Sequence, residues 1–256
     1  MLIVGLALLA TTLLPSVQPR SLTMPAPQRE AVFAGAYLVA WFLFAWNFGG
    51  LVNEASHWIT LVALPILLLH LLRHSQEAGD GFRGTLHSIG ITRQNLGPSL
   101  KLALVMGLLA APVVVWGSAK QEEVVAAIRS GRALYFFPLA FVLMLFMAGF
   151  TEEVFFRGLL QARLAAAFGS ELRGLLVATV LFGLYHLPYA YHLESWPSYG
   201  DLAWSVSQAV VEGAAGLLLG TLWLRTRNLF GGVFLHAFLN AFVVMTMPNF
   251  SIKIGG

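Results

Sequence analysis

Apolar runs recur from one end of the chain to the other, and only short polar breaks separate them. A helix rises ~1.5 Å per residue and the hydrocarbon core of a bilayer is ~30 Å thick, so a spanning helix needs about 20 mainly apolar residues. Eight stretches are candidates, of which the third and the sixth are short: 1–17, 31–52, 57–72, 100–118, 133–164, 174–189, 202–224 and 229–247. No sustained strand alternation or heptad seam competes with them. Because helices satisfy their own backbone in lipid, the pattern predicts an all-α, polytopic bundle of about eight transmembrane helices.

The composition agrees with a membrane setting. Hydrophobic residues make up 58% of the 256 residues and charged residues only 11%, against about 25% charged residues in an average soluble domain. The formal charge is +3, but no run of Lys or Arg is dense enough for a nucleic-acid surface. The expected partner is therefore the lipid bilayer and not a nucleic acid. Cysteine is absent, which excludes a thiolate nucleophile.

The basic residues divide unevenly between the two sides of an eight-span bundle. Eleven of the 15 fall on one side: Arg20, Arg29, Arg73, Arg83, Arg93, Lys101, Arg157, Arg163, Arg173, Arg225 and Arg227. Four fall on the other side: Lys120, Arg129, Arg132 and Lys253. By the positive-inside rule the first side is cytoplasmic, which predicts a multi-pass protein of the plasma or inner membrane with both termini outside. Residues 1–17 are interpreted as a retained helix in preference to a signal peptide, because no basic region precedes the apolar run.

Ionisable side chains interrupt several of the apolar runs. Each costs ~2.5–3.5 kcal/mol at bilayer depth on insertion scales and so needs an explanation. Four groups are affected: Glu152 with Glu153 and Arg157, then His186, then His236 with Asn240, and the isolated Glu212. Helical rise places the first three groups about 12–18 Å from one end of their helices. We therefore expect them to meet in one mid-membrane layer, around a polar cavity open to cytoplasmic water.

Helical spacing separates the roles of these side chains. Glu153 and Arg157 are four residues apart and can pair on one helix face, for which a structural ion pair is favoured over a direct chemical role. Glu152 points about 100° round the same helix and stays available for chemistry. For Glu212, lining the cavity or binding a polar neighbour is favoured over catalysis.

Peptide-bond hydrolysis needs an activated nucleophile, oxyanion stabilisation and a proton for the leaving amine. Glu152 can take a proton from water, and His186 can position that water. His236 and Asn240 share a helix face and can donate hydrogen bonds to the oxyanion. The hypothesis is therefore an intramembrane endopeptidase that uses no Ser or Cys nucleophile.

Three motifs stand in order on successive apolar helices: Glu152-Glu153-x-x-x-Arg157, Phe182-x-x-x-His186 and His236-x-x-x-Asn240. Together they resemble the motifs of the CPBP family, also called the ABI family, which includes the CAAX prenyl endopeptidases of the Ras-converting type. The resemblance covers about 134–244. One such motif occurs by chance in many helices, whereas three in order at matching depth are specific.

The resemblance implies a mainly eight-helix bundle with a cavity between its helices. It also implies that Glu152 and His186 activate the hydrolytic water and that His236 and Asn240 form the oxyanion site. The other two residues of the first motif would hold it in place. The substrate would be a peptide or protein at the membrane, and a prenylated CAAX tail, a bacteriocin leader and another membrane-bound peptide all stay open.

Metal chemistry is a second possibility at the same site. Members of this family are often labelled metalloproteases, and two His with a Glu are compatible with zinc. A bound metal would take Glu152, His186 and His236 as ligands. The lack of an HExxH arrangement and the resemblance to a glutamate-type protease favour metal-free catalysis, so no cofactor is expected.

On this basis the chain divides into three regions. Residues 1–132 are expected to hold N-terminal transmembrane helices, and their polar connection 73–100 to begin as a loop and end along the cytoplasmic interface. Residues 133–248 are expected to form the catalytic, CAAX-protease-like helical core, and 249–256 a short tail.

The main alternative from another class is a non-proteolytic membrane protein, an immunity or partner-binding factor that uses the same polar cavity for recognition. Transporters also place charges at the midplane, but they commonly show paired repeats, whereas these polar groups crowd into the C-terminal half.

Overall fold

The computed structural model describes residues 24–48, 54–74, 81–118, 120–192 and 198–246, together with Gly5, Leu22 and Glu194. All regular secondary structure in these residues is helical, so the predicted all-α class is confirmed. The candidate helix 1–17 and the tail 249–256 fall outside the described part, apart from the single residue Gly5.

Five described helices are long and apolar enough to cross a membrane: α2 (Pro27–Asn47), α6 (Leu96–Gly117), the helix Ala133–Phe168, α11 (Glu171–His192) and α12 (Leu202–Thr226). Two shorter apolar helices are Trp58–His74 and α13 (Leu229–Val244). A multi-pass membrane protein follows from their length and composition. These seven helices correspond to seven of the eight predicted spans, and the count of eight stays a prediction.

The sixth predicted span is longer in the structure than in the sequence pattern. It was expected over 174–189, and the helix extends to Glu171 at one end and His192 at the other. Polar and ambivalent residues at both ends continue the helix beyond the apolar run, and Pro188 lies inside it. The 22-residue helix is therefore long enough to cross the bilayer.

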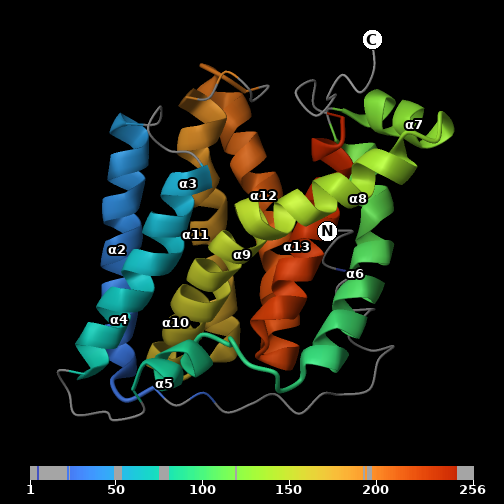
Figure 1. The fold of residues 1–256 in the computed structure, drawn as a ribbon. Coiled ribbons are helices and arrows are strands. Elements are labelled where there is room, and N and C mark those ends of the chain that lie inside the picture. Colours follow the sequence, from blue (N-terminus) through green and yellow to red (C-terminus); the bar gives the residue numbers. More distant parts are fainter. Residues whose placement is uncertain are drawn as a thin grey trace.

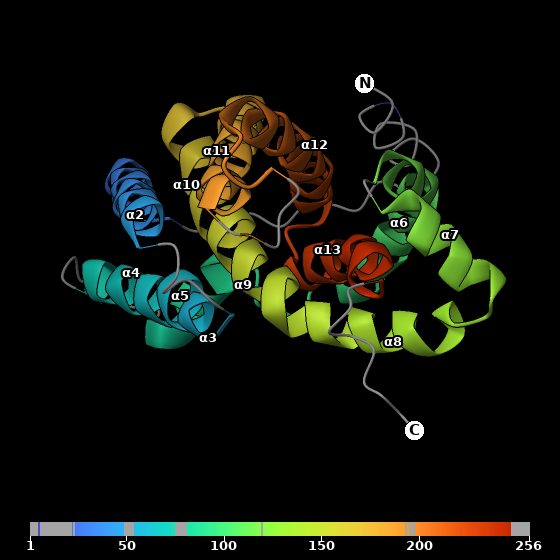
Figure 2. The ribbon, with the colours of Figure 1, turned by 90° about the horizontal axis from the view of Figure 1, so that it is seen from above.

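A single bent helix forms the centre of the molecule. It is built in order from α8 (Ala133–Met144), η3 (Leu145–Gly149), α9 (Phe150–Glu153), η4 (Val154–Gln161) and α10 (Ala162–Phe168). The two η segments are π-helical, with wider turns than the α-helix. Seen from above, α9 lies between the α2, α3 and α4 group on one side and α13 on the other (Figure 2).

The other helices pack round this centre. α11 packs on α12, α13 packs on α6 and α8, and α10 packs on α11 and α2 (Figure 1). Glycines let α11 and α12 approach closely, as small residues commonly do between membrane helices. A Cβ atom placed on Gly216 of α12 would lie 2.9 Å from the Phe182 ring of α11. This contact brings α12 against the helix that carries His186.

Shorter helices complete the described part: α3 (Glu54–His57), η2 (Trp58–Ala63), α4 (Leu64–His74), α5 (Gly81–Ser88) and α7 (Gln121–Arg129). α5 lies within the connection 73–100, of which residues 75–80 are outside the described part. Thr85 and Ser88 of α5 are buried, so this part packs on the bundle. The expected position of the connection along the cytoplasmic interface stays a prediction.

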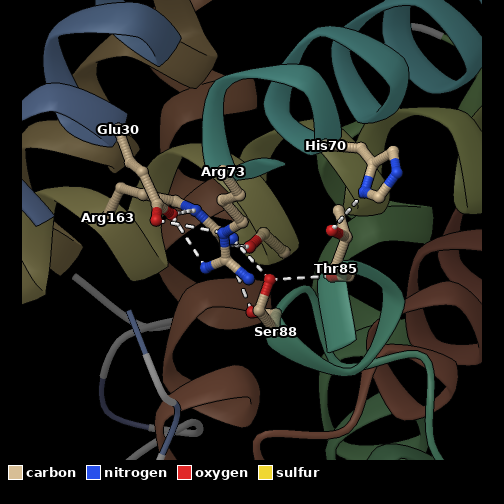
Figure 3. Close-up of polar contacts among 7 residues, drawn as sticks. Glu30, His70, Arg73, Thr85, Ser88 and Arg163 are labelled. Carbon is tan, nitrogen blue, oxygen red and sulfur yellow. Dashed lines mark hydrogen bonds and ion pairs between the residues drawn. The ribbon is translucent and has the colours of Figure 1, made fainter. Parts of the chain in front are cut away.

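A buried ion-pair network holds α5 against the bundle. Glu30 of α2 accepts hydrogen bonds from Arg73 of α4 at 3.0 and 2.9 Å and from Arg163 of α10 at 3.1 Å. Arg163 also donates to the backbone carbonyls of Ser88 and Gly158 and to the Ser88 hydroxyl. Figure 3 shows these side chains converging from three helices on the end of α5. We call Glu30, Arg73, Arg163 and Ser88 the Glu30 network.

Candidate active site

Glu152 and Glu153 of the first motif lie on α9, between the two π-helical segments, and Arg157 lies within the second of these segments, η4. π-helical turns inside longer helices occur frequently at functional sites. Glu152 and Glu153 are both buried, with 7% and 0% of their surface exposed. Residues 150–153 form a short α-helical stretch that carries the two carboxylates at successive positions.

Glu152 faces the two motif histidines. Its Oε2 atom lies 3.7 Å from Nε2 of His186 on α11 and 3.8 Å from Nε2 of His236 on α13. These distances exceed a direct hydrogen bond and fit groups that are bridged by a water molecule. Three of the four predicted catalytic residues are therefore brought together from three helices.

The backbone of α11 orients His186. Its Nδ1 atom lies 2.9 Å from the carbonyl oxygen of Phe182, one turn earlier. A carbonyl only accepts, so Nδ1 carries the proton, and in the neutral ring Nε2 has a lone pair directed towards Glu152. His186 can therefore accept a hydrogen bond from a water molecule at Glu152.

Glu153 and Arg157 form the ion pair that their spacing predicts, with Glu153 Oε1 and Arg157 Nη1 2.9 Å apart. Arg157 also donates to the carbonyl of Gly216 on α12 at 3.2 Å. Its guanidinium carbon lies 4.2 Å from the centre of the Phe182 ring, a cation–π contact. Arg157 thus fixes α12 and α11 relative to the first motif.

A further contact of Glu153 was not predicted from the sequence. Its Oε1 atom lies 3.0 Å from Nδ1 of His236, 83 positions later in the chain. The carboxylate accepts from Nδ1, which orients the imidazole so that Nε2 faces Glu152. Glu153 therefore contacts His236 as well as Arg157. Spacing within one helix could predict only the contact with Arg157, because His236 lies on another helix.

The two glutamates are left with unsatisfied oxygens. Oε2 of Glu152 and Oε2 of Glu153 are buried and make no hydrogen bond within the described residues. A buried acceptor without a partner costs ~1–3 kcal/mol, and more when it is charged. Such groups concentrate where strain or function requires them.

The remaining candidates make no hydrogen bond or ion pair with Glu152, His186 or His236 in the described part of the chain. Asn240 is one turn after His236 on α13, is half-buried, and makes no hydrogen bond among the described residues. Glu212 lies on α12, likewise half-buried. In the described part of the chain, no three His, Cys, Asp or Glu side chains are grouped so that they could hold a metal ion.

Comparison with known families also bears on these residues. Residues 134–242 match the family model described as type II CAAX prenyl endopeptidase Rce1-like. This segment is a domain of that family. The resemblance inferred from the three motifs is thereby confirmed, and every motif residue lies inside the matched segment. Searches of curated proteins and of solved structures gave no match.

The Rce1-like domain coincides with the centre of the fold. It begins one residue into α8 and ends near the end of α13, so it contains the π-helical segments and the packing of α11 on α12. It also contains the Glu152 cluster, as we call Glu152, Glu153, Arg157, His186 and His236. The helices α2 and α6 and the segment η2 lie outside the matched segment and pack against it.

Proposed function

We propose that the protein is an intramembrane endopeptidase that hydrolyses a peptide bond of a membrane-associated or lipidated substrate. The observation that carries the proposal is the position of Glu152, whose free oxygen faces Nε2 of both His186 and His236. A carboxylate and two imidazoles at this spacing can hold and activate one water molecule. Membership of the domain in a CAAX endopeptidase family supports the same reaction class.

In this proposal Glu152 is the general base. The water molecule donates to Glu152 and to Nε2 of His186, and attacks the scissile carbonyl carbon as Glu152 takes its proton. The tetrahedral intermediate then collapses and Glu152 returns the proton to the leaving amine. The products are a carboxylic acid and an amine, so no oxidant, reductant or further nucleophile is consumed.

His236 and Asn240 would stabilise the oxyanion. To donate from Nε2 while Nδ1 donates to Glu153, His236 must be doubly protonated. The Glu153 carboxylate at 3.0 Å favours that cationic form, in the way that a carboxylate supports histidine in hydrolytic triads. Asn240 follows one helical turn later, where its amide would join when substrate is bound.

Prenylated peptides are the first substrates to test, since the family description names a prenyl endopeptidase. The site is only slightly exposed, with Glu152, His186 and His236 between 6% and 8% accessible. Restricted access of this kind keeps bulk water away from the reacting groups.

Comparative peptidomics tests the proposal. Membranes that carry the wild-type protein should accumulate cleaved peptides, which membranes carrying Glu152→Gln lack. The same fragments at the same levels in both samples would contradict a protease function, and would favour a binding protein that uses the same residues for recognition.

A further inference from the structure

Glu212 lies in the middle of a membrane-spanning helix, at a position that the proposed mechanism does not use. It is ten residues from the beginning of α12 and 14 from its end, or about 15 and 21 Å along the axis. A carboxylate at this depth costs ~2.5–3.5 kcal/mol on insertion scales, and such residues generally serve a function. Glu212 makes no hydrogen bond or ion pair with any residue that the structure describes.

The exposure pattern of α12 shows which way Glu212 points. Val210 and Val211 are 68% and 57% exposed and so define the outward face of the helix. At ~100° per residue, Glu212 lies opposite the middle of the arc between them. It is nevertheless only half-buried. Glu212 therefore lies on the side of α12 that faces the bundle, and part of its side chain stays accessible.

A second polar side chain shares this face. Gln208 is four residues before Glu212 and therefore one turn away on the same side of α12. It is also half-buried and makes no hydrogen bond among the described residues. Two unpartnered polar groups in a row, on the inward face of an apolar helix, form a polar strip that is available to a ligand.

The strip leads to the Glu152 cluster. Gly216 lies one turn after Glu212, and its carbonyl accepts the hydrogen bond from Arg157. The same glycine packs on Phe182, whose carbonyl holds His186. Glu212 is thus about one turn, ~6 Å along the helix, from the point where α12 meets the site.

We propose that Glu212, with Gln208 beside it, binds a positively charged or multiply hydrogen-bond-donating group of the substrate next to the scissile bond. A basic side chain or an amine is the chemical class that a half-buried carboxylate without a partner binds best, because the pair neutralises its charge. Glu212 is a specificity-determining residue in this scheme. The inference rests on the proposed function and adds that the substrate carries a positive charge or several hydrogen-bond donors near the scissile bond.

Binding and cleavage of farnesylated peptides test the role of Glu212 separately from the proposed protease activity. In the panel a single Lys is moved through the positions on either side of the prenylated cysteine, and each peptide has a matched partner with Gln at that position. We expect the wild-type protein to prefer Lys over Gln about 10-fold in kcat/KM at one position, as for one charge-assisted hydrogen bond. Glu212→Gln should reduce that ratio to about 1, and Glu212→Lys should favour a Glu peptide instead.

The control is Glu122→Gln, the same chemical change on α7 at an exposed position outside the long apolar helices. It should keep the wild-type preference. Peptide affinities are also measured in the Glu152→Gln background, with and without Glu212→Gln. Lys-selective binding without cleavage would leave this inference standing while the protease proposal fails. Cleavage or binding with no dependence on charge at any position, or an equal loss for all peptides in Glu212→Gln, would overturn it.

Discussion

Two buried groups of Glu and Arg side chains lie in this bundle, and they differ in how completely they are satisfied. In the Glu30 network both carboxylate oxygens accept hydrogen bonds from guanidinium groups, and Arg163 uses its remaining donors on Ser88 and a backbone carbonyl. In the Glu152 cluster, one oxygen of Glu152 and one of Glu153 have no hydrogen-bond partner within the described residues.

This difference in hydrogen bonding indicates a structural role for the Glu30 network and a chemical role for the Glu152 cluster. A fully paired buried network fixes helices but offers no lone pair or proton to a ligand. A partly satisfied network is less stable by itself, and it exposes acceptors to whatever enters the site. The protein thus places a closed network at the α5 end of α2, α4 and α10, and an open one at the centre of the Rce1-like domain (Figures 1 and 3).

The largest expected effect is at Glu152. Glu152→Gln keeps the shape of the side chain and removes its ability to accept a proton, so kcat/KM should fall about 10³- to 10⁴-fold. The melting temperature should stay the same or rise, because the variant no longer buries a charged oxygen without a partner. Hydrolysis of a farnesylated reporter peptide by purified protein, with a thermal scan of the same sample, measures both. Wild-type turnover would remove the basis of the mechanism.

Glu30→Ala should show the reverse pattern. It leaves Arg73 and Arg163 buried without their carboxylate, so the free energy of unfolding should fall by ~3–5 kcal/mol. The molecules that remain folded should keep wild-type turnover. Unfolding in mixed micelles, followed by circular dichroism, measures the loss.

Glu171→Ala is the matched control for Glu30→Ala. Glu171 pairs with Arg227, and 59% of the Glu171 side chain is exposed although Arg227 is buried. Because solvent screens the exposed carboxylate, its loss should cost only about 1 kcal/mol. Equal destabilisation by the two variants would show that burial of the Glu30 network adds nothing.

Glu153→Gln should reduce kcat about 10²-fold with little change in KM. The amide cannot stabilise a cationic His236, so the proposed oxyanion donor is weakened by an amount comparable to the loss of one donor. Glu153→Asp should restore part of the rate because it returns the charge. Measuring kcat, KM and unfolding on the same samples separates the roles, since a purely structural Glu153 would lower stability and leave kcat unchanged.

Gly232→Ala tests the placement of the Glu153 carboxylate by steric displacement. A Cβ atom at Gly232 would lie 2.7 Å from Oε2 of Glu153, so the carboxylate must move. We expect turnover to fall about 5- to 10-fold, equivalent to ~1–1.4 kcal/mol, the lower part of the range for overpacking. Gly213→Ala is the control, because its Cβ would meet the Thr179 carbonyl at an ordinary 3.6 Å. A similar loss in both variants would argue against a specific role for the Glu153 position.

The smallest effect is expected from metal removal. If Glu152 activates water without a metal, a chelator should leave turnover unchanged and purified protein should hold zinc well below one ion per chain. Elemental analysis and an activity assay before and after chelation measure this. Stoichiometric zinc, with activity that is lost on removal and restored on return, would instead make Glu152, His186 and His236 metal ligands.

Much of the fold could be predicted because the backbone of a spanning segment must satisfy its own hydrogen bonds within the bilayer. A run of about 20 apolar residues must be a helix in lipid, so the apolar runs alone located the long helices. Their ends were less predictable, as with Glu171 and His192, which are polar enough to resemble loop residues and still continue α11. The π-helical segments around Glu152 leave no trace in the hydrophobic pattern, because they depend on packing.

The sequence by itself determined that Glu152, His186 and His236 are polar anomalies in apolar helices, and that Glu153 can pair with Arg157 one turn away. Both follow from local periodicity. Only the tertiary structure decided that Glu153 also holds His236, and that Glu30 joins Arg73 and Arg163, two residues that the charge count had only assigned to the cytoplasmic side. The physical reason is that a helix fixes neighbours within one turn, whereas contacts between helices depend on how three-dimensional packing brings distant segments together.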